Sequence, residues 1–322
     1  MTAPVMAALQ WVGSHSALEP LGPQAARIHG LWRFMWIVAA VVFVAVMAML
    51  VHAAAHRRRG DGEAAKERTM RRAVGVATAL TVVVLIVFLA LDFGTGRALT
   101  MPPQEAVQIR VIGHQWWWDV RYPSPDPSEE VQTANEIHVP VGRPVVIRLE
   151  ARDVNHSFWP PSLVGKRDLI PGEQSSIWFR ADTPGVFRGQ CAEFCGHQHA
   201  KMGFLVIADP PERYAEWMAA QRDSAHTPSD SSARRGQEVF LASSCVMCHA
   251  IKGTPAGSRV GPDLTHLASR RTIAAGTLPN TRGNLAGWIV DPQSIKPGTL
   301  MPSNNLSPDD LQALLSYLET LR

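Results

Sequence analysis

Two long apolar runs stand near the start of the chain, ahead of any alternating pattern. Residues 34–51 contain no charged side chain, and a second uncharged run covers residues 73–91. Each run is close to the roughly 18–20 residues that an α-helix needs to cross the hydrocarbon core of a bilayer. The pattern therefore predicts two transmembrane helices, spanning about 32–55 and 73–92.

Two other interpretations fit these runs less well. A cleaved signal peptide has a short apolar region preceded by basic residues, whereas the first run comes late in the chain and its basic cluster, 57–59, follows it. A buried core helix does not explain the second run, which is apolar on every side and begins beside Arg71 and Arg72. The membrane interpretation is therefore preferred for both runs.

The connection between the two runs predicts their orientation. It reads HRRRGDGEAAKERTMRR and is rich in Arg and Lys. Cytoplasmic loops of membrane proteins carry an excess of these residues. The N-terminus and everything after Asp92 are then expected on the periplasmic or extracellular side of a bacterial plasma (inner) membrane that the chain crosses twice.

Past residue 97 the pattern changes to short alternating segments broken by Pro and Gly. In one segment Val145, Ile147 and Leu149 alternate with polar residues, which is typical of a half-buried strand. Several strands at short spacing favour a β-sandwich or barrel of about 110 residues. The predicted strands are Ala106–Ile112, Val145–Glu150, Ser176–Arg180 and Phe204–Ala208.

Length, charge and cysteine content narrow the classes of function. A chain of 322 residues suggests two or three domains. The net charge is +3 with acids and bases mixed, so no nucleic-acid partner is expected. The four cysteines form two tight pairs, CAEFC and CVMCH, and none remains to bridge distant segments. Because each pair lies among metal-ligand residues, both predict cofactor sites.

The first pair is part of a soft donor set. Cys191 and Cys195 are followed by His199 and Met202, so two thiols, an imidazole and a thioether fall within a short segment. Soft sulfur with imidazole favours copper, especially Cu(I). A disulfide between the two cysteines and a zinc site are the alternatives, although the added His and Met favour copper.

The second pair follows a polar segment, 221–233, that predicts a flexible linker. A short helix is expected over Arg235–Cys245. The sequence C-x-x-C-H attaches c-type haem, with Cys245 and Cys248 bonded to the vinyl groups and His249 bound to iron.

The sixth iron ligand is expected to be Met301, because a thioether opposite His raises the haem potential as an electron carrier needs. His266 is the rival ligand, and Met247 lies inside the attachment turn, where it cannot easily reach the opposite haem face. A final amphipathic helix is predicted over Pro308–Leu321.

The pattern C-x-E-x-C-x3-H-x2-M, with DVNHSFWPPSLVGKRDLIPG upstream, resembles subunit II of haem–copper cytochrome c oxidases. The resemblance implies a cupredoxin-like fold that holds binuclear copper A, with its two copper ions bridged by the two thiolates. The implied copper ligands are His156, Cys191, Cys195, His199, Met202 and the backbone carbonyl of Glu193.

The same resemblance assigns roles to neighbouring residues. It gives the Glu193 side chain a contact with Mg2+ at the interface with subunit I, and its spacing selects His199 rather than His197. In the segment GHQWWW it makes Trp116 the electron-entry residue, whereas Trp118 is expected to pack. Glu67 precedes the second run, but without the aromatic and proline that flank the family's proton-uptake glutamate, so a solvated charge is the alternative.

From about residue 20 onward the chain resembles a caa-type subunit II with a fused class I cytochrome c domain. The expected parts are a transmembrane helical hairpin in 1–96, a cupredoxin-like all-β domain in 97–220, the linker 221–233 and an all-α cytochrome c domain in 234–322. The implied function is electron transfer from haem c through copper A to a catalytic subunit that reduces O2 to water with proton pumping.

The partners that this resemblance implies are oxidase subunits I and III, membrane lipid, and a donor such as cytochrome c or a bc-type complex. The oxygen-reducing site is expected in subunit I, because this chain has no set of membrane-embedded histidines; His52 lies only at the edge of a span.

Three rival functions are less consistent with the residues. A nitrous-oxide-reductase-like enzyme needs many more histidines for its catalytic cluster. A quinol-oxidase subunit keeps the fold but loses the copper ligands, which are present here. A membrane-tethered copper chaperone needs no haem, so the C-x-x-C-H sequence with Met301 argues against it.

Overall fold

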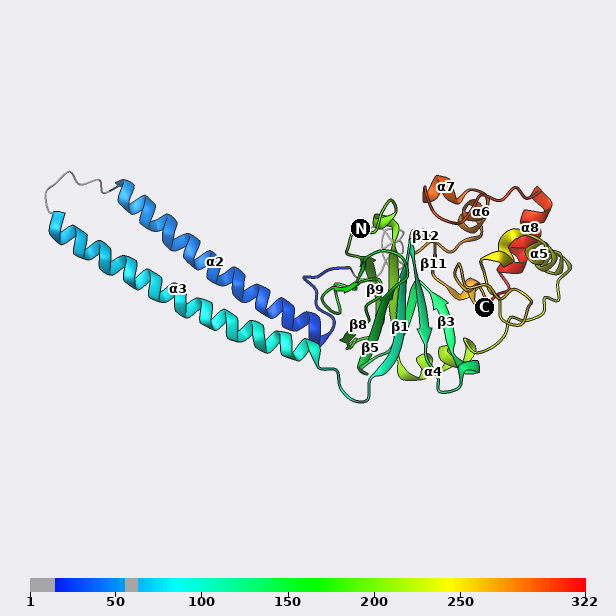
Figure 1. Ribbon diagram of the computed structural model, residues 1–322, viewed down its shortest axis with the longest axis horizontal. Helices are drawn as coiled ribbons and strands as arrows, with labels where there is room; N and C mark the ends of the chain where they lie inside the picture. The colour runs from blue at the N-terminus through cyan, green and yellow to red at the C-terminus, as the bar shows by residue number, and fades with distance from the viewer. Residues whose placement is uncertain (1–14, 56–62) are drawn as a thin grey trace, which may run out of the picture. The chain divides into compact units, whose positions relative to one another are not determined.

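The computed structural model describes residues 15–55 and 63–322, and it divides into two compact units (Figure 1). One unit is residues 26–101. The other joins the described residues before 26 with residues 102–322. Residues 56–62, which include part of the basic loop that predicts orientation, lie outside the described residues.

Helices α2 (Pro23–Ala55) and α3 (Glu63–Thr100) contain the two predicted spans. Both are long and apolar enough to cross a membrane, and their apolar windows are not buried against protein. Both helices extend beyond the apolar runs, and α3 stops shortly before Pro102, which cannot continue a helix. Near the start of α3, Glu67 forms an exposed ion pair with Arg71 at 2.8 Å.

A β-sandwich follows the hairpin in the sequence (Figure 1). Its first sheet has the strand order β3-β2-β1-β5-β8, and its second has the order β4-β10-β9-β6-β7. The strands are β1 (Val107–His114), β2 (Trp117–Tyr122), β3 (Val131–Ala134), β4 (Glu136–Pro140), β5 (Val145–Ala151), β6 (His156–Trp159), β7 (Arg167–Leu169), β8 (Ser175–Phe179), β9 (Gly185–Cys191) and β10 (Gly203–Asp209).

Alternation along the strands builds the core between the sheets. In β5 the side chains of Val145, Ile147 and Leu149 are fully buried, while Arg148 is exposed. The predicted strands correspond to β1, β5, β8 and β10 within one or two residues at each end. The sequence prediction of a two-helix hairpin followed by a cupredoxin-like β-sandwich is therefore confirmed.

The C-terminal part is mainly helical, as predicted, with one small addition. A two-stranded ladder, β11 (Thr272–Ile273) and β12 (Leu278–Pro279), interrupts the helices. The helices of this part are α5 (Ser231–Ala242), α6 (Arg282–Val290), α7 (Pro292–Ile295) and α8 (Pro308–Leu318). Helix α4 (Pro211–Ala220) belongs instead to the predicted all-β domain, where Trp217 packs on the sandwich core.

Helix α5 begins inside the segment that the sequence predicts as a flexible linker. The Asp230 side chain caps the helix by accepting a hydrogen bond from the Ala233 backbone N–H at 3.0 Å. Earlier in the same segment, the backbone N–H of Ala225 donates to the carbonyl oxygen of Lys252. Part of the linker is therefore ordered against the helical domain.

Candidate functional site

The topology brings the predicted copper ligands to one end of the sandwich. His156 begins β6, Cys191 ends β9, and Met202 lies immediately before β10. Strands β6 and β9 are hydrogen-bonded neighbours, with Phe158 opposite Cys191. The register therefore places His156 beside the loop that carries the two cysteines.

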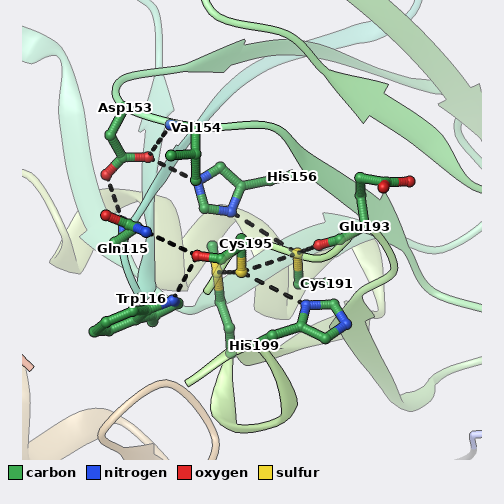
Figure 2. A network of polar contacts seen from close by, with 10 residues as sticks. Gln115, Trp116, Asp153, Val154, His156, Cys191, Glu193, Cys195 and His199 are labelled. Carbon is green, nitrogen blue, oxygen red and sulfur yellow. Dashed lines mark hydrogen bonds and ion pairs between the residues drawn. The ribbon is translucent and has the colours of Figure 1, made fainter. Parts of the chain in front are cut away.

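The side chains of this loop point toward one another (Figure 2). Nδ1 of His156 lies 3.8 Å from Sγ of Cys191, and Nδ1 of His199 lies 3.5 Å from Sγ of Cys195. The two sulfur atoms are 3.8 Å apart, well beyond the roughly 2.05 Å of a disulfide bond. The structure therefore does not contain the alternative disulfide.

Two further donors complete the group. The Met202 Sδ lies 3.8 Å from the Cys195 Sγ, and the carbonyl oxygen of Glu193 lies 3.2 Å from the Cys191 Sγ. Both cysteines and Met202 are buried. A buried set of sulfur, imidazole and carbonyl donors fits copper better than a hard cation.

A carboxylate behind His156 determines which ring nitrogen faces the sulfurs. Oδ1 of Asp153 lies 2.9 Å from Nε2 of His156, and the carboxylate also accepts hydrogen bonds from the backbone N–H groups of Val154 and Gln115, both at 2.7 Å. Metal-binding histidines usually direct their second ring nitrogen to such a group. Asp153 was not predicted from the sequence, although its position three residues before His156 was an available signal.

Electrostatics prepare the paired thiols for a cation. The hydrogen bond with Cys195 lowers the pKa of Cys191 to about 3, and contact with His156 acts in the same direction. The same pairing, together with burial, raises the pKa of Cys195. Burial opposes protonation of His156, but its hydrogen bonds with Asp153 and Cys191 outweigh burial and raise its pKa. One thiolate is thus readily formed, and a bound cation would favour the second.

Residues of the turn between β1 and β2 donate hydrogen bonds to the backbone of residues 191–202, which carry the cysteines, His199 and Met202 and are called the copper loop below. Nε1 of Trp116 donates to the carbonyl oxygen of Cys195 at 2.9 Å, and Nε2 of Gln115 donates to the same oxygen at 2.8 Å. The Trp116 side chain is buried. Trp118 packs in the core, edge-on to Phe158, as the sequence analysis expects.

Three other histidines do not join this group of copper-ligand residues. The His197 side chain is exposed. His114 stacks on Trp117, and Nδ1 of His138 pairs with Asp209 at 2.7 Å. His114 and His138 therefore make their contacts outside the copper-ligand group.

The haem-attachment residues line a cavity of about 440 Å3. Cys245, Cys248, His249 and Met301 all contribute to its wall, together with apolar side chains such as Leu314. The predicted thioether and iron-binding residues therefore share one apolar space, and this combination fits a covalently bound haem.

The cavity discriminates between the candidate iron ligands. Nδ1 of His249 is hydrogen-bonded to the carbonyl oxygen of Pro262 at 2.7 Å, which leaves Nε2 for a metal. His266 does not line the cavity, and its Nδ1 lies 2.8 Å from the carbonyl oxygen of Arg322. Of the two predicted rivals, Met301 lines the cavity and His266 does not.

Arg270 also lines the cavity and was not predicted from the sequence. Its Nε is buried without a hydrogen-bond partner, while its Nη2 donates to the carbonyl oxygen of Asp263. Burial lowers the pKa of this guanidinium. A buried cation with a free N–H is suited to an anionic group, and haem carries two propionates. The neighbouring pair Arg270–Arg271 gave no sequence signal that separates this residue from a surface arginine.

The β-sandwich forms one side of the same cavity. Gln115, Trp116, Trp117 and Asn135 line it together with the helical domain. Trp116 thus lies in the cavity wall and also contacts the copper loop. Neither this shared cavity wall nor the contact between Trp116 and the copper loop was predicted from the sequence.

Comparison with known families agrees with both sites. A family model for the periplasmic domain of cytochrome c oxidase subunit II matches residues 125–208, and a cytochrome c model matches residues 233–322. The periplasmic domain of subunit II of cytochrome oxidase from Bradyrhizobium japonicum is a similar solved structure, with 29% identity, 38% of this chain and 97% of that chain covered, and a TM-score of 0.36.

Full-length relatives extend the likeness. Cytochrome c oxidase subunit 2 of Bacillus subtilis is 31% identical over 229 residues, which cover 68% of this chain and 63% of that protein. Cytochrome c oxidase subunit 2 of Alkalihalophilus pseudofirmus is 38% identical over 317 residues, which cover 95% of this chain and 91% of that protein. Because the likeness runs through nearly the whole chain, the protein belongs to the cytochrome c oxidase subunit 2 family, as a membrane-anchored oxidase subunit with a cytochrome c domain.

Proposed function

We propose that this chain passes electrons from a covalent haem c through binuclear copper A to subunit I of a haem–copper oxidase, which reduces O2 to water with proton pumping. The observation that carries the proposal is the position of Trp116. Its ring lines the haem cavity, and its indole N–H donates to the carbonyl oxygen of Cys195. One buried side chain thus contacts both sites, which fits its assignment as the electron-entry residue of the copper domain.

The copper domain supplies a rigid, buried ligand set. Two copper ions bound there would provide one-electron redox chemistry. Asp153 orients His156, and the strands on either side of the loop hold the sulfurs close together. The ligands we assign are His156, Cys191, Cys195, His199, Met202 and the carbonyl of Glu193.

The haem domain supplies the attachment and iron-binding groups. Cys245 and Cys248 would form the thioether bonds, and His249 and Met301 would bind the iron. The unpartnered N–H of Arg270 would hydrogen-bond a haem propionate. Boundaries near residues 97, 221 and 234 divide the membrane hairpin, copper domain, linker and haem domain in this assignment.

The remaining assignments concern the surroundings of the chain. Both soluble domains would lie on the periplasmic or extracellular face, with lipid around α2 and α3 and with subunits I and III as neighbours. The Glu193 carboxylate points away from the sulfurs (Figure 2) and pairs with Lys166 at 3.5 Å. It would be available to Mg2+ at the interface with subunit I. A cytochrome c or bc-type donor would reduce the haem domain.

Optical and electron paramagnetic resonance spectra of the purified full-length chain test the proposal. A reduced c-type haem band together with a mixed-valence two-copper signal is expected. His199→Ala should abolish the two-copper signal and leave the haem band unchanged. The matched control is His197→Ala, which alters an exposed histidine two residues away and should leave both signals intact.

The two domains can be tested separately in the same way. Met301→Leu should alter the haem spectrum and leave the copper signal unchanged, whereas His266→Ala should retain Met ligation. A single-copper signal, or none, in a wild-type chain that binds haem would contradict the copper A assignment.

A further inference from the structure

Lys296 is a buried lysine that no role described above uses. It lies five residues before Met301, and only 2% of its surface is exposed. Its ammonium group donates to the carbonyl oxygen of Trp116 at 2.8 Å and to that of Ala274 at 3.3 Å. A buried lysine of the haem domain is therefore inserted beside the copper-domain tryptophan that contacts both sites.

Burial of a lysine side chain in this position is energetically unfavourable. Burial strips water from its ammonium group, and no carboxylate among the described residues forms an ion pair with it. Burying a charge without an ion-pair partner carries a desolvation penalty that hydrogen bonds to carbonyl groups offset only in part. An apolar residue would fill the same space without this cost, so packing alone does not explain the lysine.

The contact of Lys296 belongs to a short bridge between the two cofactor loops. Nε2 of Gln198 donates to the carbonyl oxygen of Pro297 at 2.7 Å, and Lys201 donates to that of Ile295. Gln198 and Lys201 flank His199 on the copper loop. Residues 295–297 belong to the segment 295–301 that ends at Met301 and is called the haem loop below. Side chains of the copper loop thus donate hydrogen bonds directly to the backbone of the haem loop.

Trp116 is enclosed by the same two loops. A Cβ atom added at Gly196 of the copper loop would lie 3.2 Å from its ring, and one added at Gly298 of the haem loop would lie 3.8 Å from it. Its indole N–H is fixed by Cys195 and its backbone carbonyl by Lys296. The copper loop therefore binds the side chain of Trp116, and the haem loop binds its backbone.

We propose that Lys296 is a positioning residue for electron transfer between haem c and copper A. By donating a hydrogen bond to the carbonyl oxygen of Trp116, it fixes the haem loop against the tryptophan that contacts the copper loop. The proposal rests on the proposed function, because it concerns transfer between those two cofactors. The electron lost by ferrous haem c is the one gained by the mixed-valence copper pair, so no further reactant is needed.

Other contacts should keep the domains together when Lys296 is changed. The bonds made by Gln198 and Lys201 remain, and Glu136 of β4 accepts hydrogen bonds from the backbone N–H groups of Arg271 and Thr272. Removing the ammonium group is therefore expected to loosen the local contact and leave the domain interface in place.

The test compares Lys296→Met with wild type in the full-length chain. Amide hydrogen exchange at residues 116–118 and 296–300 should accelerate about tenfold, because one buried hydrogen bond to a charged group is lost. Exchange in α8 should not change. In the assembled oxidase, the rate of electron transfer from flash-reduced haem c to copper A should fall about tenfold, as small misplacements of reacting groups do. The haem and copper spectra should remain those of wild type.

Lys252→Met is the matched control, because Lys252 donates to the carbonyl oxygen of Arg222 and lies outside the haem cavity. It should change neither exchange at residues 116–118 nor the transfer rate. Wild-type exchange and a wild-type rate in a Lys296→Met protein that binds both cofactors would overturn the proposal.

Two further outcomes separate this proposal from the proposed function. If the wild-type chain lacks the copper A signal, the proposed function fails, while the exchange measurement still tests the Lys296 contact. If Lys296→Met does not bind both cofactors, Lys296→Gln replaces it, since a shorter amide cannot reach both carbonyl groups. Wild-type exchange and rate in that variant would equally overturn the proposal.

Discussion

The carboxylate of Glu136, on strand β4 of the copper domain, accepts a hydrogen bond from the backbone N–H of Thr272 in the haem domain at 2.9 Å. The same oxygen accepts from the N–H of Arg271 at 2.7 Å. Glu136 is 3% exposed, so these hydrogen bonds are shielded from solvent. One copper-domain carboxylate therefore satisfies two backbone donors of the segment that follows Arg270.

Glu136→Ala should weaken the contact between the domains by about 1.5–3 kcal/mol, because two donors lose a charged acceptor. Faster amide exchange at residues 271–273, measured in the full-length chain, would show this. Glu136→Gln is the control, since its amide oxygen can still accept the two bonds and should protect these amides better than alanine does. Equal exchange in both variants would show that the hydrogen bonds do not hold the segment.

Stability should depend on pH through Lys296. Burial, with a contribution from the nearby Lys201 charge, lowers the pKa of Lys296 to about 7 from its usual 10.5. The unfolded chain therefore binds more protons at this site between these two values, so the folded state gains stability as pH rises from about 7 toward 10.5. The gain is fully present above the unfolded pKa and is lost as pH falls through the folded value.

The measurement is the free energy of unfolding of the full-length chain against pH, compared with Lys296→Met. The difference in favour of wild type should grow with pH across this window, by at most about 1.4 kcal/mol per pH unit. Parallel curves for the two proteins would contradict the lowered pKa.

The packing of α5 on α8 gives a third prediction. A Cβ atom added at Gly236 in α5 would lie 1.9 Å from the carbonyl oxygen of Ala313 in α8. Gly236→Ala should therefore push the helices apart and destabilise the haem domain by about 1–3 kcal/mol. Denaturant unfolding followed through the haem absorption band would measure the loss.

Gly287→Ala is its control, because Gly287 lies in α6 with open space around an added Cβ. Alanine there should stabilise the helix by about 0.5–1 kcal/mol, since glycine loses more backbone freedom on folding. Destabilisation of the same size in both variants would remove the steric explanation.

Local patterns predicted the two long helices, four of the sandwich strands and the closing helix, and they singled out side chains that the fold brings together. Alternation in Val145–Glu150 predicted β5 because one face of that strand meets the core and the other meets solvent. The spacing of Cys191, Cys195, His199 and Met202 predicted their convergence because a single loop supplies all four. His156 came from the family resemblance, and the pairing of β6 with β9 explains why it joins them.

Contacts between the two soluble domains had no comparable signal. Glu136 and Lys296 are ordinary charged residues in the sequence, and the fold buries each of them against backbone groups of the other domain. Arg270 looks like its neighbour Arg271 until the fold turns its Nε into the protein. The start of α5 was placed too late because the Asp230 cap was not recognised within a polar segment.

Removing the carboxylate behind His156 should reduce copper affinity. Asp153→Ala leaves Nε2 of His156 without its partner and frees the backbone N–H groups of Gln115 and Val154. Such changes typically cost about 10–100-fold in metal affinity. Copper titration of the full-length chain against a competing chelator would measure the loss. Asp182→Ala, which removes an exposed partner of Arg180, should leave the affinity unchanged.

The indole N–H of Trp116 should matter more than its ring area. Trp116→Phe keeps an aromatic side chain in the cavity wall but loses the hydrogen bond to the Cys195 carbonyl. Transfer from haem c to copper A should slow about tenfold, on the order expected when a contact between reacting groups is misplaced. Trp178→Phe is the matched control, because Nε1 of Trp178 is buried on β8 without a hydrogen-bond partner. The same substitution there removes no contact, so slowing confined to Trp116→Phe would attribute the effect to the bond with Cys195, and equal rates in the two variants would exclude it.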